Sequence, residues 1–215
     1  PFYGFVLACV DEPGVQAILP RIKKPLVTYG FSRQADYRIE EYSSNNGVSK
    51  FTVVNKDNVL GDIEFHVAGR HNAKNALGAL AMALEEGIAF DVVQKALQSF
   101  TGVKRRFEYL GESKHNFKVY DDYAHHPAEV SATLQGAREA FPKCKLVVAF
   151  QPHLYSRTQD QLETFASAFL NCDSLVLLPI YGAREQPIEG VTSTLLAEES
   201  VKRGHRQVGV VSGFN

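Results

Sequence analysis

Residues 119–130 read Val-Tyr-Asp-Asp-Tyr-Ala-His-His-Pro-Ala-Glu-Val, and this stretch decides the fold of the second half of the chain. It opens with apolar residues typical of a strand, continues through two carboxylates, a phenol and two imidazoles, and reaches a proline suited to a helix start. In an open α/β sheet, ligands bind where strands lead into helices. The stretch therefore predicts a strand–helix unit that carries a site, although Asp and His are also ordinary loop and capping residues.

Strands and helices alternate from this stretch to the end of the chain, which indicates a doubly wound parallel sheet with helices on both faces. Residues 146–150 are apolar without alternation, as in strands covered on both faces. The expected strands are residues 117–121, 145–150, 174–179 and 207–211, and the expected helices are residues 127–141, 158–170 and 194–203.

The first half has a different pattern, in which short strands precede helices. Three alternating segments predict a small antiparallel sheet, with Asn46-Gly47 as one turn: residues 37–42, 50–54 and 62–67. Leucines with helical spacing predict a helix from Asn72 that Gly87 ends, and Asp91 is expected to cap a second helix. We expect a domain junction at residues 106–111.

The bulk composition fits one large or two small globular domains without a membrane span. The 215 residues are 45% hydrophobic and 22% charged, with a net charge of −1, so no broad attraction to nucleic acid or to an acidic membrane is implied. Cys9, Cys144 and Cys172 are odd in number and widely spaced, and we expect them to be buried free thiols in a reducing cytosol. Their spacing does not suit a zinc site, and no metal ligand is expected on this chain.

Residues 69–75, Gly-Arg-His-Asn-Ala-Lys-Asn, form a first polar cluster at an expected helix start. Asn72 and Asn75 are three positions apart, so they share one face of the first turn. Carboxamides can pair with the donor and acceptor edge of adenine. The alternative is that Asn72 merely caps the helix.

The run Lys104-Arg105-Arg106 is a second cluster, which follows a glycine. Three cations there suit phosphate binding, since the guanidinium forks can each hold two oxygens. The alternative is a solvated surface run.

Two further clusters follow neighbouring strands. In the first, Asp121 and Asp122 would point to opposite faces of a persisting strand, so one of them is expected to be structural, and His126 can cap the helix. In the second, residues 151–158 read Gln-Pro-His-Leu-Tyr-Ser-Arg-Thr. Because both clusters leave strands at the same sheet edge, we expect them to lie side by side.

Two phosphate-binding motifs are absent from the sequence. It contains neither a Gly-x-x-x-x-Gly-Lys-Ser/Thr phosphate loop nor a Gly-x-Gly-x-x-Gly fingerprint. If the protein uses a nucleoside triphosphate, the main phosphate cradle lies outside this chain.

The four clusters, in this order, resemble signatures of the Mur ligases, the ATP-dependent amide-bond ligases of peptidoglycan synthesis. The shared patterns are Gly-x-His-Asn-x-x-Asn, Gly-Val-x-Arg-Arg-Phe, Asp-Asp-Tyr-x-His-His-Pro and Gln-Pro-His-x-Tyr-Ser-Arg-Thr. The resemblance covers essentially the whole chain, and the last two patterns together are highly specific.

The resemblance implies a fragment of a three-domain cytoplasmic enzyme. Residues 1–108 would be the latter part of the central ATP-binding α/β domain, with its small antiparallel sheet. Residues 109–215 would be most of the C-terminal domain, a doubly wound, Rossmann-like parallel sheet. The phosphate loop would lie in the missing part, so this chain alone is not expected to catalyse the reaction.

The resemblance also implies roles for individual residues. The substrates would be ATP with Mg²⁺, UDP-N-acetylmuramate and L-alanine, and the main Mg²⁺ ligands would lie outside this chain. The residues implied for the nucleotide are His71, Asn72, Asn75, Arg106 and Asp122. The residues implied for L-alanine and the muramoyl carboxylate are Tyr123, His125, His153 and Arg157.

The implied chemistry passes through an acyl phosphate that the amine of L-alanine attacks. Arg106 would stabilise charge on phosphate oxygens, and a neutral imidazole would take the proton of the amine, with His125 as first candidate and His153 as second. Leu154 departs from some family members, which carry Arg there, so Arg157 would face the amino-acid carboxylate alone unless another cation substitutes.

Other functions remain open at this stage. One alternative is a related ATP-dependent amide ligase for another muramoyl peptide or for folate, although the Gln-Pro-His pattern argues against both. A non-enzyme alternative is a nucleotide-binding regulatory module that has lost its phosphate loop.

Overall fold

A computed structural model describes residues 4–212, and the chain divides into two compact units, Pro1–Val103 and Lys104–Asn215. The basic run Lys104-Arg105-Arg106 therefore belongs to the second unit, at its beginning. The two units are described separately below.

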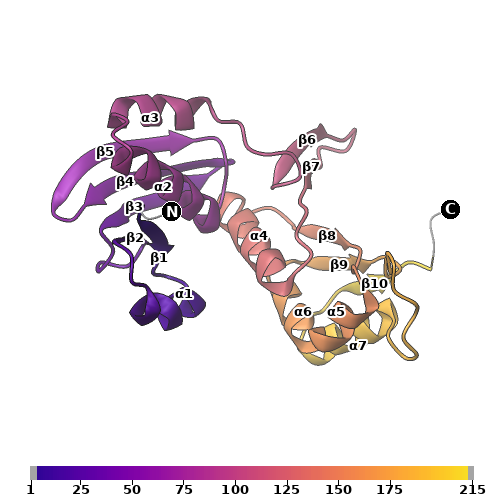
Figure 1. Ribbon diagram of the computed structural model, residues 1–215. Coiled ribbons are helices and arrows are strands. Elements are labelled where there is room, and N and C mark those ends of the chain that lie inside the picture. Colours follow the sequence, from indigo (N-terminus) through magenta and orange to yellow (C-terminus); the bar gives the residue numbers. More distant parts are fainter. Residues whose placement is uncertain (1–3, 213–215) are drawn as a thin grey trace. The chain divides into compact units, whose positions relative to one another are not determined.

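The first unit is built on one mixed five-stranded sheet with the order β1-β2-β3-β4-β5 (Figure 1). Strands β1, β2 and β3 pair in parallel, whereas β3–β4 and β4–β5 pair antiparallel. The predicted antiparallel pairing of the three alternating segments is confirmed. These segments are β3, β4 and β5, and they belong to the same sheet as the parallel strands. The strands are β1 (Val6–Cys9), β2 (Leu26–Gly30), β3 (Tyr37–Asn45), β4 (Val48–Asn55) and β5 (Asn58–Phe65).

Helix α2 (Arg70–Glu85) supplies most of the helical side chains in the core on this sheet, beside α3 (Phe90–Ser99). Leu77 and Leu80 are fully buried against the sheet, and Gly87 adopts φ 83° just beyond the helix end, as expected. Gly78 lets the helix approach the sheet closely, because a Cβ there would lie 2.9 Å from Cζ of Tyr29. The short helices α1 (Pro13–Ile18) and η1 (Leu19–Arg21) connect β1 to β2.

The expectation that Asp91 caps α3 is wrong. Ala89 occupies the N-cap, and Asp91 lies inside the first turn, where its carboxylate is 3.5 Å from the Lys95 ammonium at i+4. Val92 is 54% exposed, whereas Val93 is buried and Leu97 packs on the core. The helix therefore begins one residue before Asp91, at Phe90.

The second unit contains a parallel three-stranded sheet, in the order β10-β9-β8, and a separate antiparallel pair, β6–β7. The expected strand 117–121 is present as β7, but it pairs with β6, a strand that sequence patterning missed at the domain junction. The strands are β6 (Glu108–Glu112), β7 (Lys118–Asp121), β8 (Val147–Phe150), β9 (Ser174–Leu177) and β10 (Val208–Val210).

The helices of this unit largely follow the expected pattern. One expected helix, 158–170, is broken at Gln161, which has φ −120° and ψ 23°. The helical spacing of Val130, Leu134 and Ala137 predicts one buried face of α4, and all three residues are buried. The helices are α4 (Pro127–Ala140), α5 (Tyr155–Asp160), α6 (Leu162–Ala168), η2 (Phe169–Asn171) and α7 (Ser193–Lys202).

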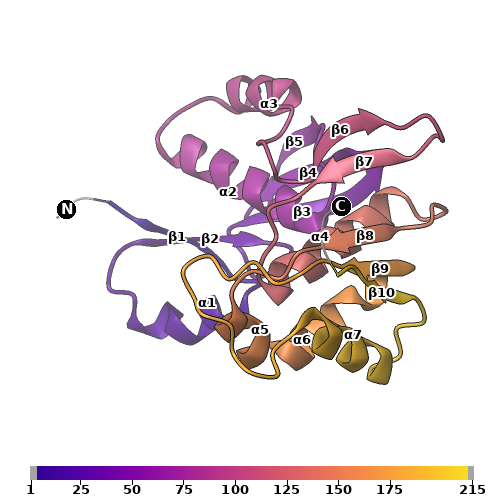
Figure 2. The same cartoon turned by 90° about the vertical axis from the view of Figure 1, so that its right-hand side faces the viewer.

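The core of this unit lies on one face of the parallel sheet. Side chains of α4, α6, η2 and α7 meet Phe150, Leu175 and Leu177 in a single cluster. Figure 2 shows α6 and α7 below strands β9 and β10. Val147 points the other way and is 61% exposed. Within the described residues 4–212, the prediction that both faces of the strand at 146–150 are covered is therefore wrong. An apolar run predicts a strand, but it does not show what packs on each face.

The cysteines also differ from expectation, because Cys144 is exposed and Cys9 only half-buried. Cys172 is buried, which raises the pKa of its thiol to about 11. Its Sγ lies 3.3 Å from Nε2 of the buried His205. Among residues 4–212, no helix is long and apolar enough to cross a membrane.

Candidate active site

Three loops follow the strand ends of the second unit, and they build the site. We call them the β7–α4 loop (122–126), the β8–α5 loop (151–154) and the β9–α7 loop (178–192). The first two carry the predicted residues. The third was not part of the prediction.

The β8–α5 and β9–α7 loops are joined by backbone hydrogen bonds. The amide of Tyr181 donates to the carbonyl of Pro152 at 2.8 Å, and the amide of Leu154 donates to the carbonyl of Tyr181 at 2.9 Å. The ring centroids of His153 and Tyr181 lie 5.6 Å apart. Tyr181 is thus a site neighbour that sequence patterning missed, although the rule that strands end at a common edge also points to its loop.

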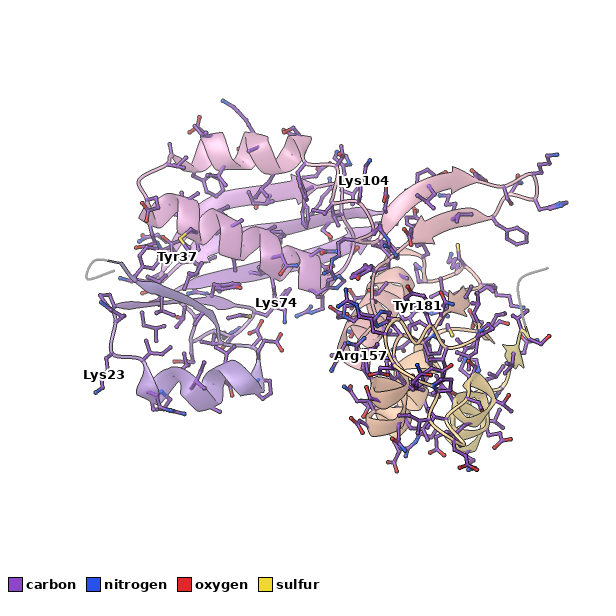
Figure 3. The ribbon with its side chains drawn as sticks, turned by 45° about the vertical axis from the view of Figure 1, so that its right-hand side comes forward. Lys23, Tyr37, Lys74, Lys104, Arg157 and Tyr181 are labelled. Atoms are coloured by element: carbon purple, nitrogen blue, oxygen red, sulfur yellow. The ribbon has the colours of Figure 1, made fainter. Side chains whose placement is uncertain are left out.

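Arg157, in the first turn of α5, joins the β7–α4 and β8–α5 loops. Its Nη1 lies 3.4 Å from the carbonyl oxygen of His125, 3.4 Å from Nδ1 of His153 and 3.5 Å from the carbonyl oxygen of His153. Figure 3 shows Arg157 and Tyr181 at the same end of the second unit. The expected adjacency of the two loops is confirmed.

His125 is held by groups of its own loop and helix. Its Nδ1 lies 3.0 Å from the carbonyl oxygen of Tyr123 and 3.4 Å from Oε2 of Glu129. Its ring centroid is 6.4 Å from that of His153. The structure therefore brings together three of the predicted residues, His125, His153 and Arg157, from two loops.

Glu129 was missed by sequence reasoning, and it organises the start of α4. His126 caps the helix, as expected, because its Nδ1 accepts from the Ala128 amide at 3.3 Å. Glu129 completes the capping box by accepting from the amides of His125 and His126 at 3.0 and 3.2 Å. Burial raises the pKa of the Glu129 carboxyl, but these amides and the charges of His125 and Arg106 outweigh it and lower the pKa overall.

Asp122 serves the backbone in this structure. Its carboxylate accepts from the Phe107 amide at 2.9 Å and from the Ala124 amide at 2.7 Å. Asp121 instead lies 3.4 Å from the guanidinium of Arg105. The prediction that one of the two aspartates is structural is thus supported by Asp122, since each of its carboxylate oxygens accepts a backbone amide.

Arg106 and Tyr123 stay largely accessible. The guanidinium of Arg106 is 52% exposed and lies 3.7 Å from Oε1 of Glu129. Tyr123 is 49% exposed, and the guanidinium of Arg105 stands 4.6 Å from its ring centroid. An exposed cation and phenol beside His125 are available to a ligand.

The predicted adenine residues lie in the first unit, at the start of α2. Gly69 is the N-cap, with φ 99°, so the reading of Asn72 as the cap is wrong. The Asn72 amide instead donates to the carbonyl of Ala68 at 2.7 Å. Asn75 is exposed, and His71 is half-buried.

Lys74, in the same turn, was missed as well. It forms an ion pair with Glu12 that ties this turn to the start of α1. Burial lowers the pKa of the Lys74 ammonium, but the hydrogen bond to Glu12 and nearby acidic groups outweigh it and raise the pKa overall. The sequence did carry a signal for Lys74, because this residue lies in the same polar cluster as Asn72 and Asn75.

The site in the second unit can move protons and hold anionic oxygens. It offers two imidazoles, a guanidinium and an exposed phenol within two strand-to-helix loops. Within residues 4–212, no three His, Cys, Asp or Glu side chains gather as a metal site requires. The groups that are present suit acid–base chemistry on a substrate with carboxylate or phosphate oxygens.

The fold and the site define an α/β protein in which imidazole, guanidinium and phenol groups gather where strands lead into helices. A family model for the Mur ligase middle domain matches residues 1–83, and one for the Mur ligase glutamate ligase domain matches residues 105–214. The chain belongs to the Mur ligase family.

Curated relatives narrow the comparison within this family. The UDP-N-acetylmuramate–L-alanine ligase of Salinibacter ruber is 49% identical over 98% of this chain, which spans 44% of that protein. The corresponding ligase of Anaeromyxobacter dehalogenans strain 2CP-C is 51% identical, again over 98% of this chain and 46% of the relative. The chain therefore spans less than half the length of these relatives.

Solved structures agree with this assignment. UDP-N-acetylmuramate–alanine ligase from Thermotoga maritima superimposes with a TM-score of 0.72 at 30% identity, covering 86% of this chain and 39% of that one. Folylpolyglutamate synthase from Mycobacterium tuberculosis, in complex with ADP and AMPPCP, gives a TM-score of 0.68 at 20% identity, over 93% of this chain and 43% of that one. The second likeness concerns the fold alone.

Proposed function

We propose that this chain is part of a cytoplasmic enzyme that ligates L-alanine to the carboxylate of UDP-N-acetylmuramate during peptidoglycan precursor synthesis. The observation that carries the proposal is the contact of Arg157 with both His125 and His153, which unites the two most specific sequence patterns in one site. The identity of 49–51% with relatives named for this reaction supports the choice of substrate.

The proposed roles follow the chemistry of each group. ATP activates the muramoyl carboxylate as an acyl phosphate, and the amine of L-alanine then attacks it. Arg157, with Tyr123, holds carboxylate oxygens of the substrates. An imidazole takes the proton of the amine. Arg106, exposed at the start of the second unit, stabilises charge on phosphate oxygens.

The start of α2 fits an adenine base only in part. Asn75 is exposed and can offer both its donor and its acceptor. One amide hydrogen of Asn72 already bonds to the Ala68 carbonyl, so its other amide hydrogen and its carbonyl oxygen are the groups that it can offer to the base. We assign His71 to the same pocket and Asp122 to the nucleotide, and we assign the Mg²⁺ ligands to the part of the relatives that this chain does not match.

We further propose that residues 1–108 are the latter part of the central ATP-binding domain and residues 109–215 most of the C-terminal domain. Since the sequence lacks a phosphate loop, the isolated chain should bind ATP no more tightly than about millimolar, or roughly −4 kcal/mol. Titration calorimetry on the chain tests this, and micromolar affinity would contradict it.

Activity is tested in a chimera, in which these 215 residues replace the matching segment of the Salinibacter ruber ligase. The expected result is phosphate release that depends on both L-alanine and UDP-N-acetylmuramate. The unaltered Salinibacter ruber ligase is the positive control. A chimera that folds and binds ATP but releases no phosphate with these substrates, and does so with another amino acid or muramoyl peptide, would overturn the proposed substrate.

A further inference from the structure

The chemistry of the site leaves two imidazoles as candidates for the proton acceptor, His125 and His153. A neutral imidazole can accept a proton only at the nitrogen that carries no hydrogen. Which nitrogen that is depends on the partner of the other one. Carbonyl and carboxylate oxygens only accept hydrogen bonds, whereas a guanidinium only donates them, so the neighbours of each ring decide its tautomer.

The neighbours of His125 Nδ1 are both acceptors. The carbonyl oxygen of Tyr123 lies at 3.0 Å and Oε2 of Glu129 at 3.4 Å. The lowered pKa of the Glu129 carboxyl keeps it ionised at neutral pH, so it cannot donate. The hydrogen of the neutral His125 ring therefore sits on Nδ1, and the lone pair is left on Nε2.

The neighbour of His153 Nδ1 is a donor. Nη1 of Arg157 lies at 3.4 Å, and Arg157 has no acceptor atom and does not lose its proton in proteins. The same nitrogen of Arg157 also faces the carbonyl oxygens of His125 and His153. Nδ1 of His153 therefore keeps its lone pair, and the ring hydrogen sits on Nε2.

We propose that the two histidines are held in opposite tautomers, so that His125 is the proton acceptor and His153 is a hydrogen-bond donor. Glu129 and Arg157 act as positioning residues for them, through His125 and His153 respectively. The tautomers rest on the contacts of the two rings and on the ionised state of Glu129, whereas the division of chemical labour rests also on the proposed function.

The proposed step balances as follows. The lone pair of the amine nitrogen forms a bond to the acyl carbon, and the bond from that carbon to the phosphate oxygen breaks, with its electron pair leaving on phosphate. The surplus proton of the nitrogen passes to Nε2 of His125. The Nε2–H of His153 donates to an oxygen that gains negative charge during the attack.

The tautomers are measured on the 215-residue chain by long-range ¹H–¹⁵N NMR of its histidine rings at about pH 8, where unperturbed imidazoles are neutral. His125→Gln and His153→Gln identify the two ring signals. The expected pattern is Nδ1–H for His125 and Nε2–H for His153. Two rings in the same tautomer would overturn the proposal.

Two variants test the positioning residues. Glu129→Gln keeps the oxygen that the amides of His125 and His126 need but removes the negative charge beside Nδ1, so the preference of His125 for the Nδ1–H form should weaken. Arg157→Ala should release His153 toward a mixture of tautomers. Glu198→Gln, at an exposed position of α7, is the matched control and should leave both rings unchanged.

Kinetics in the chimera separate this proposal from the proposed function. Glu129→Gln should lower kcat roughly tenfold, the lower end expected for a charge-assisted hydrogen bond, with little change in the KM for L-alanine. An unchanged kcat would overturn the role given to His125. A chimera without any L-alanine-dependent activity would instead contradict the proposed function, and the NMR pattern would still decide the tautomers.

Discussion

Helices α4 and α5 start from neighbouring loops of the same unit, but their first turns are stabilised in different ways. At α4 the N-cap His126 has an ordinary extended backbone, and the side chains of His126 and Glu129 satisfy the free amides. At α5 the N-cap is Leu154, which has φ 73° and ψ 134° and no capping side chain. There the amide of Leu154 bonds to the Tyr181 carbonyl, and the buried hydroxyl of Thr158 donates to the Leu154 carbonyl.

The difference shows how polar residues divide between folding and chemistry. The start of α4 uses two of its charged or polar side chains for its own helix and leaves His125 for the site. The start of α5 is held by backbone contacts and a buried hydroxyl, so His153 and Arg157 are both left for the site. The price is a strained backbone at Leu154, in a region that only glycine adopts easily.

The largest expected effect concerns the two adjacent histidines of the β7–α4 loop. In the chimera, His125→Ala should lower kcat by about 10²–10⁴-fold, the range for a lost general base. His126→Ala removes only the cap, so it should lower stability and leave kcat largely unchanged. Steady-state kinetics on both variants test this prediction. Equal losses of kcat would show that both histidines act through the structure of the loop.

Arg157 should give the next largest effect. Arg157→Ala in the chimera should raise the apparent KM for L-alanine about tenfold to a hundredfold, because a charge-assisted hydrogen bond to the carboxylate is lost. Arg184→Ala removes an exposed cation from the β9–α7 loop and serves as the control. If L-alanine dependence stays unchanged in Arg157→Ala, Arg157 serves only the contact between the loops.

Glu129 should affect stability by a smaller amount. Glu129→Ala removes half of the capping box, so the free energy of unfolding of the chain should fall by about 1 kcal/mol at pH 7, as measured by urea denaturation. Glu198→Ala, at an exposed position of α7, is the control. A loss no larger than in the control would mean that His126 suffices as the cap.

The same carboxylate predicts a pH dependence. The pKa of Glu129 is lowered in the folded chain, so its ionised form stabilises the fold above its unfolded pKa, about 4.3. That contribution is lost as the pH falls through the lowered folded-state pKa. The difference in unfolding free energy between the wild type and Glu129→Gln should therefore shrink below about pH 4. A difference that is constant with pH would contradict this.

Leu154 should give the smallest effect, but one with an unusual sign. Alanine normally stabilises a chain relative to glycine. At φ 73° the order should reverse, so Leu154→Gly should be more stable than Leu154→Ala by about 1 kcal/mol. Gln161, with φ −120°, is the control position, where alanine should be the more stable. The ordinary order at both positions would show that the backbone at Leu154 relaxes.

Much of the second unit could be predicted because its signals are local. The apolar spacing of Val130, Leu134 and Ala137 identifies the buried face of α4. The expected neighbourhood of the β7–α4 and β8–α5 loops is confirmed by Arg157, but β7 and β8 lie in separate sheets, so the rule that strands end at one edge holds only for β8 and β9. What a strand pairs with is not local, so β7 was expected in the parallel sheet, and β6 was missed.

The missed site residues have physical reasons as well. Glu129 lies three residues after the N-cap, as in a capping box, but His126 is not among the usual capping residues, so the pattern was not recognised. Tyr181 is placed beside His153 by backbone hydrogen bonds with Pro152 and Leu154, and backbone hydrogen bonds leave no pattern of side chains in the sequence. Asp91 has the residue type of a cap but lies two positions after the N-cap Ala89, and residue type alone does not fix a helix boundary.

The mixed sheet of the first unit has a consequence for the order in which it folds. Strands β3, β4 and β5 are joined by tight turns, so their pairing closes short loops and costs little chain entropy. The parallel pair β1–β2 must first close a crossover through α1 and η1. Contacts of low sequence separation form faster, so the β3–β5 meander should be the nucleus on which the parallel strands assemble. Pulse-labelling hydrogen exchange would show its amides protected ahead of those of β1, and the opposite order would exclude this nucleus.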